Sequence, residues 1–138
     1  MSTKKSVSII GCGISGIFAA LELKKAGIEN IQLYDKSRGV GGRLATRRAN
    51  DGKFDHGIQY IKLEEIINYE EIKKLISSQT LIKTNLENIY VGKEGMTGIA
   101  KSLSKDLIIN KEFKLSQIDS KDNSLIMKFE NNKKIQTD

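Results

Sequence analysis

Three glycines near the start of the chain, at positions 11, 13 and 16, form the pattern Gly-x-Gly-x-x-Gly. Gly11 permits a tight turn, Gly13 lets the backbone approach a pyrophosphate, and Gly16 lets a helix pack closely on a strand. A helix that begins within this pattern offers unpaired N–H groups and the positive end of its dipole to an anion. The spacing therefore predicts a turn that binds dinucleotide phosphates, given a strand before it and a helix after it.

An acidic residue follows at the distance that ribose recognition requires. Asp35 comes nineteen residues after Gly16, at the end of a second predicted strand, where a carboxylate can accept hydrogen bonds from ribose hydroxyls. The alternative is an exposed aspartate at a strand end, but the register with the glycine motif favours ribose binding. The negative charge disfavours NADP, because a 2′-phosphate would be repelled.

A second glycine-rich loop follows Asp35 and bears on the choice between FAD and NAD. Gly41 and Gly42 permit close approach by a ligand, and the planar guanidinium of Arg43 can neutralise a pyrophosphate. All four arginines of the chain lie between positions 38 and 48, so we assign them to a small-molecule phosphate before a nucleic-acid backbone. A plain NAD domain would continue to another helix and strand, so this loop favours FAD.

Short elements must position these residues. Residues 6–10 and 31–34 predict strands, and the helical spacing of apolar residues over 14–25 predicts a helix between them. This is one βαβ unit. The sequence therefore predicts the α/β class, with a Rossmann-like βαβ unit at its start. Residues 36–57 predict an ordered loop with a helical turn near 44–46.

The rest of the chain predicts a partial antiparallel β and helical extension. Its expected elements are a strand over 58–61, a helix over 64–77, strands over 81–82 and 89–91, a short helix capped by Thr97, and a hairpin of 113–118 and 125–129.

The chain resembles FAD-dependent oxidoreductases related to amine oxidases, and most closely the renalase family. The shared signature runs from Asp35-Lys36 through Gly41-Gly42-Arg43 and Thr46 to Phe-Asp-His-Gly-Ile-Gln-Tyr over residues 54–60. The segment 95–100 also resembles that family. The first sixty residues carry the specific part of the resemblance.

This resemblance implies a set of cofactor contacts. Ser15 would hydrogen-bond a phosphate, Asp35 with Lys36 would hold the adenosine ribose, and Arg43 would bind the pyrophosphate. Gln59 and Tyr60 would lie near the flavin ring. The complete expected set for FAD is Gly11, Gly13, Ser15, Gly16, Asp35, Lys36, Gly42, Arg43, Gln59 and Tyr60. The flavin performs the redox chemistry, so no catalytic side chain is assigned.

The resemblance also implies an activity and a division of the chain. Family members transfer hydride from a reduced small molecule, for renalases a dihydronicotinamide isomer, to FAD and then to O2. We expect a single domain with a dinucleotide-binding core over 1–62. Residues 63–95 would begin a substrate-domain insertion, and residues 96–138 would form a helix and a hairpin that return toward the core.

This chain has 138 residues, whereas members of the family that it resembles are much longer. The family fold is expected to be incomplete here, with its C-terminal half absent. A second interpretation therefore stands beside the enzyme: a non-catalytic or truncated nucleotide-binding module that requires a complementing C-terminal polypeptide.

The composition of the chain argues against disulfide-bonded, membrane-spanning, metal-binding and nucleic-acid-binding classes of protein. The single cysteine, Cys12, excludes an internal disulfide and favours the cytoplasm. No apolar run is long enough to cross a bilayer, and no cluster of Cys and His indicates a metal site. The net charge is +6, but the lysines are scattered and no aromatic–basic pattern accompanies them. We expect a small-molecule substrate, and neither a nucleic acid nor a membrane as partner.

Overall fold

The computed structural model describes residues 5–64 and 66–138, which fall into two compact units. Unit 1 comprises the described residues up to Val40 together with Asp106–Asp138. Unit 2 comprises Gly41–Lys105. The chain thus leaves unit 1 after the first part of the glycine-rich region and returns to it more than sixty residues later. The two units divide the predicted site residues between them.

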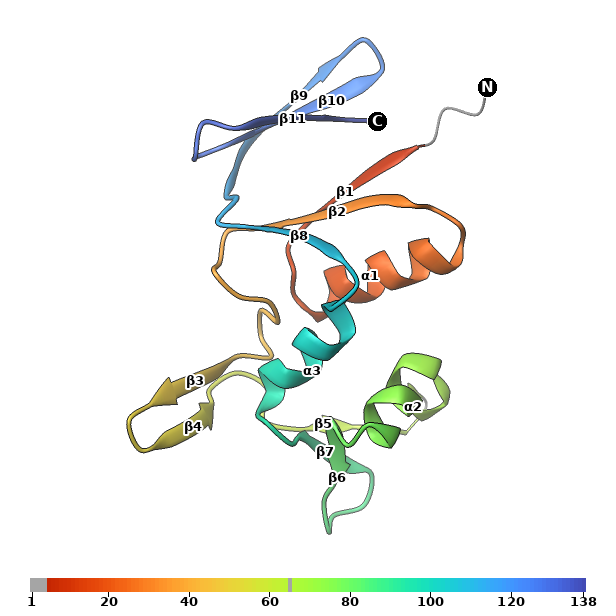
Figure 1. Ribbon diagram of the computed structural model, residues 1–138, viewed down its shortest axis with the longest axis vertical. Coiled ribbons are helices and arrows are strands. Elements are labelled where there is room, and N and C mark those ends of the chain that lie inside the picture. Colours follow the sequence, from red (N-terminus) through yellow and green to blue (C-terminus); the bar gives the residue numbers. More distant parts are fainter. Residues whose placement is uncertain (1–4, 65) are drawn as a thin grey trace. The chain divides into compact units, whose positions relative to one another are not determined.

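Unit 1 contains the predicted βαβ arrangement (Figure 1). Strand β1 (Ser6–Ile10) pairs in parallel with β2 (Asn30–Asp35), and helix α1 (Ile14–Lys25) connects them. A third parallel strand, β8 (Ile108–Lys111), pairs with the other edge of β2 and gives the order β1-β2-β8. The α/β class and the Rossmann-like unit are confirmed, whereas β8 was not predicted.

The side chains of β2 alternate between two apolar cores of unit 1. Ile31 and Leu33 pack with Ala20 of α1 on one face of the sheet. Tyr34 packs on the opposite face with Met127 and Phe129, and the Tyr34 and Phe129 rings stack with centroids 5.2 Å apart. The apolar residues of β2, which made it predictable as a strand, thus supply both cores.

An antiparallel sheet supplies the second of these cores. Its strands are β9 (Leu115–Lys121), β10 (Ser124–Phe129) and β11 (Lys134–Thr137), in the order β11-β10-β9. Figure 1 shows this sheet on the side of the parallel strands away from α1. The predicted hairpin is confirmed, although its first strand lies at Leu115–Lys121 rather than 113–118, and β11 extends it. The end of the chain lies against β1, because the Ser6 N–H donates to Oδ2 of Asp138 at 2.9 Å.

Unit 2 combines short strands with two helices (Figure 1). The elements are the hairpin β3 (Thr46–Ala49) and β4 (Gly52–Asp55), the antiparallel sheet β5 (Ile61–Lys62), β7 (Ile89–Gly92) and β6 (Leu81–Lys83), the 3-10 turn η1 (Ile66–Asn68), and the helices α2 (Glu70–Ser77) and α3 (Met96–Ser104). Its buried side chains include Leu63, Leu75, Leu81, Met96 and Ile99.

Four local predictions for unit 2 are wrong or need new boundaries. The expected helical turn near 44–46 is absent, because Thr46 begins β3 and the expected loop contains a hairpin. The strand expected over 58–61 is reduced to Ile61–Lys62. The helix expected over 64–77 is a 3-10 turn followed by α2, and Glu65 lies outside the described residues. Thr97 does not cap α3, because Gly95 with a φ of +90° precedes the helix as its N-cap.

Candidate functional site

The glycine turn between β1 and α1 has the geometry that the motif predicts. Gly11 has a φ of +105°, a conformation that L side chains rarely adopt, and its N–H donates to the Tyr34 carbonyl at 2.7 Å. A Cβ atom at Gly16 would collide with the Gly11 carbonyl oxygen. Gly11 therefore serves the turn itself, and Gly16 allows α1 to approach it.

The N-terminus of α1 remains available to an anion. Its N-cap is Gly13, which has no side chain to accept the first N–H groups, and no acidic residue lies in the first helical turn. Ser15, in that first turn, is exposed. Unpaired N–H groups at a helix N-terminus attract phosphate through both hydrogen bonding and the helix dipole.

Asp35 is joined directly to this turn. Its Oδ2 accepts a hydrogen bond from the Cys12 N–H at 2.6 Å, and its Oδ1 accepts one from the Ser37 N–H at 2.7 Å. Burial alone would raise the pKa of the Asp35 carboxyl, but these backbone hydrogen bonds, together with the Ser37 side chain and the charge of Lys36, hold that pKa below 3.8. Each carboxylate oxygen keeps a further lone pair that a hydroxyl group can use.

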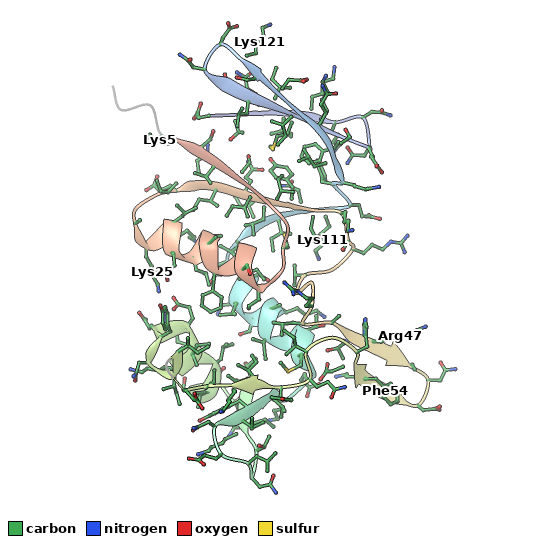
Figure 2. All side chains as sticks on the ribbon, turned by 180° about the vertical axis from the view of Figure 1, so that it is seen from behind. Lys5, Lys25, Arg47, Phe54, Lys111 and Lys121 are labelled. Atoms are coloured by element: carbon green, nitrogen blue, oxygen red, sulfur yellow. The ribbon has the colours of Figure 1, made fainter. Side chains whose placement is uncertain are left out.

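A cation that the sequence interpretation missed lies beside Asp35. Lys111, at the end of β8, is the register partner of Asp35, and Figure 2 labels its side chain. Burial and the Asp35 charge raise the pKa of the Cys12 thiol to about 11, and the charge of Lys111 opposes them. Cys12 is therefore a protonated packing residue at neutral pH. The signal that could have located Lys111 was the short apolar run 107–109 before it.

The loop after Asp35 is held to the end of β8. Arg38 Nε donates to Glu112 Oε1 at 3.3 Å in an exposed ion pair, and the Glu112 N–H donates to the Ser37 carbonyl. Lys36 is exposed beside them. The carboxyl ends of β2 and β8 thus form one hydrogen-bonded edge, the position where open α/β sheets bind ligands.

The second glycine-rich loop lies in unit 2 and pairs with the segment that follows β4. The Arg43 carbonyl accepts a hydrogen bond from the Ile58 N–H at 2.8 Å, and the Ala45 carbonyl accepts one from the His56 N–H at 3.1 Å. A Cβ atom at Gly57 would collide with the Arg43 carbonyl oxygen. This pairing extends the β3–β4 hairpin and brings the Arg43 loop beside the start of the Gln-Tyr segment.

The predicted cofactor residues therefore form two groups, each within one unit. Unit 1 brings together Gly11, Gly13, Ser15, Gly16, Asp35 and Lys36, and unit 2 contains Gly42, Arg43, Gln59 and Tyr60. Arg43, Gln59 and Tyr60 are exposed. The individual roles of all these residues in binding stay predictions.

Over residues 5–64 and 66–138, no three His, Cys, Asp or Glu side chains gather in a way that could hold a metal ion. No helix in these residues is both long enough and apolar enough to cross a membrane.

Comparison with known proteins identifies the glycine-rich half of the chain. The model of the NAD(P)-binding Rossmann-like domain family matches residues 9–77. L-amino-acid oxidase of Neurospora crassa is 27% identical over 107 residues, which cover 75% of this chain and 15% of that protein. A Dictyostelium discoideum protein named "Probable flavin-containing monoamine oxidase A" is 41% identical over 61 residues, or 44% of this chain and 13% of that one.

Solved structures support the fold. The CLA-producing fatty acid isomerase from P. acnes matches with a TM-score of 0.73 at 8% identity, covering 100% of this chain and 58% of that chain. The chain spans 15% of the Neurospora relative and 6% of a tryptophan 2-monooxygenase from Rhizobium rhizogenes that it also matches. The similarity thus concerns a small part of much longer proteins.

Proposed function

Because the chain belongs to the NAD(P)-binding Rossmann-like domain family, we propose that it is the N-terminal FAD-binding portion of a renalase-like flavin-dependent oxidoreductase. The reaction would move a hydride from a reduced small molecule to FAD, and O2 would then take two electrons and two protons to give hydrogen peroxide. The observation that carries the proposal is the hydrogen bond from the Cys12 N–H to Asp35. It fixes a carboxylate for ribose beside a turn suited to phosphate.

The residues of unit 1 fit the adenosine and phosphate part of the cofactor. A Cβ atom placed on Gly11 would meet nothing within 4 Å, so the turn is open to a ligand. The uncapped N-terminus of α1 and the Ser15 hydroxyl would donate to phosphate oxygens. Asp35 would accept from the ribose hydroxyls through its remaining lone pairs, with Lys36 beside it. When bound, FAD supplies the hydride acceptor that the protein's side chains do not provide.

The residues of unit 2 fit the flavin part. Phe54, Ile58 and Tyr60 expose 55%, 40% and 56% of their surface, a high fraction for large apolar side chains close together in sequence. A flat aromatic ring could cover such side chains, with Gln59 supplying hydrogen bonds to its polar edge. Arg43 and Gly42 would approach the pyrophosphate. The name of the Dictyostelium relative, "Probable flavin-containing monoamine oxidase A", supports a flavin over a free nicotinamide cofactor.

We propose a dihydronicotinamide isomer as the reduced substrate, and the segment 63–95 as the start of a substrate-domain insertion. The single Cys12, with its protonated and buried thiol, suits the cytoplasm that we propose as the compartment.

A second candidate function is a nucleotide-binding module that acts only with a complementing polypeptide. The exposed apolar side chains on the outer strands of the parallel sheet favour it. In the described residues β1 pairs in the sheet with β2 alone, and Ile10 and Ile108 on its outer strands are 47% and 59% exposed. An added polypeptide could cover both the edge and these apolar side chains.

Anaerobic reduction of the flavin tests the enzyme proposal and separates the two candidates. The chain is mixed with FAD and a dihydronicotinamide isomer, and the loss of flavin absorbance is followed before oxygen is admitted. Reduction and then hydrogen peroxide from the chain alone support a complete enzyme. Reduction only after a C-terminal polypeptide from a full-length relative is added supports the module. Bound FAD that no dihydronicotinamide reduces in either mixture contradicts the proposed reaction.

A further inference from the structure

A basic pocket of ≈ 250 Å³ lies within unit 2, between the β3–β4 hairpin and α3. Figure 1 shows these elements next to each other. Its charged lining consists of Arg48 and Lys53 from the hairpin, Glu94 from the turn before α3, and Lys101 from α3 itself. None of these residues belongs to the set proposed for FAD.

The charges of the pocket are not balanced. Arg48 and Lys53 are register partners across the hairpin, an arrangement in which like charges destabilise a strand pair. Lys53 Nζ donates to Glu94 Oε2 at 2.6 Å, and this hydrogen bond, with the charge of Lys53 and a smaller effect of Arg48, lowers the pKa of Glu94. The one carboxylate that lines the pocket, Glu94, makes its ion pair with Lys53, and Arg48 acts on Glu94 only through its charge. Three cationic side chains against one carboxylate leave an excess of two positive charges.

The walls of the pocket are tied together by hydrogen bonds. The Thr46 N–H donates to the Thr97 hydroxyl at 2.7 Å, and the Thr97 N–H donates to the Thr46 hydroxyl at 3.0 Å. The hydroxyl protons are themselves used inside the fold, by Asp55 and by the Leu44 carbonyl. The arrangement is therefore preformed, and a ligand would be bound by the cationic side chains rather than by the threonines or the start of the helix.

Gly98 of α3 lines the pocket without a side chain that would fill it. A Cβ atom at this position would meet only the Glu94 Cβ, at an ordinary contact distance of 3.6 Å. A helix is less stable with glycine than with alanine in its interior. Neither packing nor the backbone conformation requires glycine at position 98. Its presence leaves room next to Lys101 for a bound group.

We propose that this pocket is a phosphate-binding site, formed by Arg48, Lys53 and Lys101 around one dianionic group. The excess of two positive charges matches a phosphate or phosphate ester, and the arginine fork suits its oxygens. The phosphate would be either free inorganic phosphate or the phosphate of a nucleotide. This site is independent of the FAD proposal, because it shares no residue with it.

Amide NMR titration of the full chain tests the site. Inorganic phosphate and adenosine monophosphate are added separately at constant ionic strength, with sodium chloride as the ionic reference. We expect saturable shifts at Gly98 and Lys101 with phosphate and none with chloride. Adenosine monophosphate binding about tenfold more tightly than phosphate would identify a nucleotide as the source, whereas equal affinities would identify free phosphate.

The hairpin offers a matched control. Arg47 is adjacent to Arg48 and projects from the opposite face of the same strand, where Figure 2 labels it with Phe54. Arg48→Met and Lys101→Met should each weaken phosphate binding about tenfold, the loss expected for one charge-assisted hydrogen bond, while Arg47→Met should leave it unchanged. Shifts that follow chloride equally, or equal losses in Arg47→Met and Arg48→Met, would overturn the proposal.

Discussion

The Cys12 N–H donates to Oδ2 of Asp35 over 2.6 Å, and this single bond joins the glycine turn to the end of β2. The two residues are 23 positions apart and lie at the ends of neighbouring parallel strands. The bond fixes the carboxylate and partly neutralises the N–H-rich turn, without closing the turn to a ligand. Asp35 therefore has a role in the fold as well as the role that we propose for it in binding.

Asp35→Asn should lower both stability and FAD affinity. An asparagine side chain can accept only one of the two backbone hydrogen bonds through its oxygen, so we expect a loss of about 1–2 kcal/mol in unfolding free energy. FAD binding should weaken about tenfold, because the ribose loses a charged acceptor. Urea denaturation and flavin-fluorescence titration measure the two effects.

Asp51→Asn is the control for that change, because Asp51 is exposed in the turn between β3 and β4. This substitution should alter neither the unfolding free energy nor the affinity for FAD. If the two variants behaved alike, Asp35 would have no special role.

The stability that Asp35 provides should depend on pH. Its pKa in the folded chain lies below the ordinary value of 3.8, so the unfolded chain takes up the proton first as the pH falls. The contribution is complete well above pH 3.8 and is lost as the pH falls toward the folded pKa. The difference in unfolding free energy between the wild type and Asp35→Asn should therefore shrink below about pH 4. A difference that grew on acidification would contradict the hydrogen bonds assigned to this carboxylate.

The Cys12 thiol should react slowly in the folded chain. Its pKa is raised from 9.0 to about 11, which lowers the thiolate fraction at neutral pH by about a hundredfold before any steric protection. Alkylation of the native chain should therefore be at least that much slower than alkylation in urea, as followed by mass spectrometry. Lys111→Met should slow it further, because the positive charge of Lys111 opposes the shift; an unchanged or faster rate would contradict the position of Lys111 beside the turn.

Gly16→Ala should destabilise unit 1. The new methyl group would collide with the Gly11 carbonyl oxygen, so α1 must move away from the turn. We expect a loss of about 2–4 kcal/mol in unfolding free energy, the range of a severe steric change in a core. Gly39→Ala is the matched control, since a Cβ atom there meets nothing within 4 Å and should cost less than about 0.5 kcal/mol. Equal midpoints in urea for the two variants would contradict the close approach at Gly16.

The elements around the glycine motif could be predicted from sequence because their signals are local. Gly11 and Gly27 lie at the ends of β1 and α1 with positive φ values, and β2 contains the apolar residues Ile31, Leu33 and Tyr34 directly before Asp35. By contrast, β8 is short, and its pairing with β2 joins residues more than seventy positions apart. Lys111 was missed for that reason: the apolar run 107–109 could have indicated a strand before it, but the pairing with β2 is what places it beside Asp35.

The β3–β4 hairpin was missed for a different reason. Its strand Thr-Arg-Arg-Ala is polar on both faces and largely exposed, so no alternation of apolar residues indicates a strand. The N-cap predicted at Thr97 was wrong because the local pattern does not show the distant partner of its hydroxyl group. A threonine before an apolar helical pattern favours an N-cap, but Gly95 takes that position and the Thr97 hydroxyl donates to the Leu44 carbonyl, a partner far away in sequence.

Calorimetric titration of the purified chain with FAD and with NAD, under the same salt conditions, tests the central proposal most directly. We expect FAD to bind with one-to-one stoichiometry and at least about tenfold more tightly than NAD, and Asp35→Asn to weaken FAD binding. Binding of NAD with no detectable binding of FAD would contradict the proposal that this chain holds a flavin cofactor.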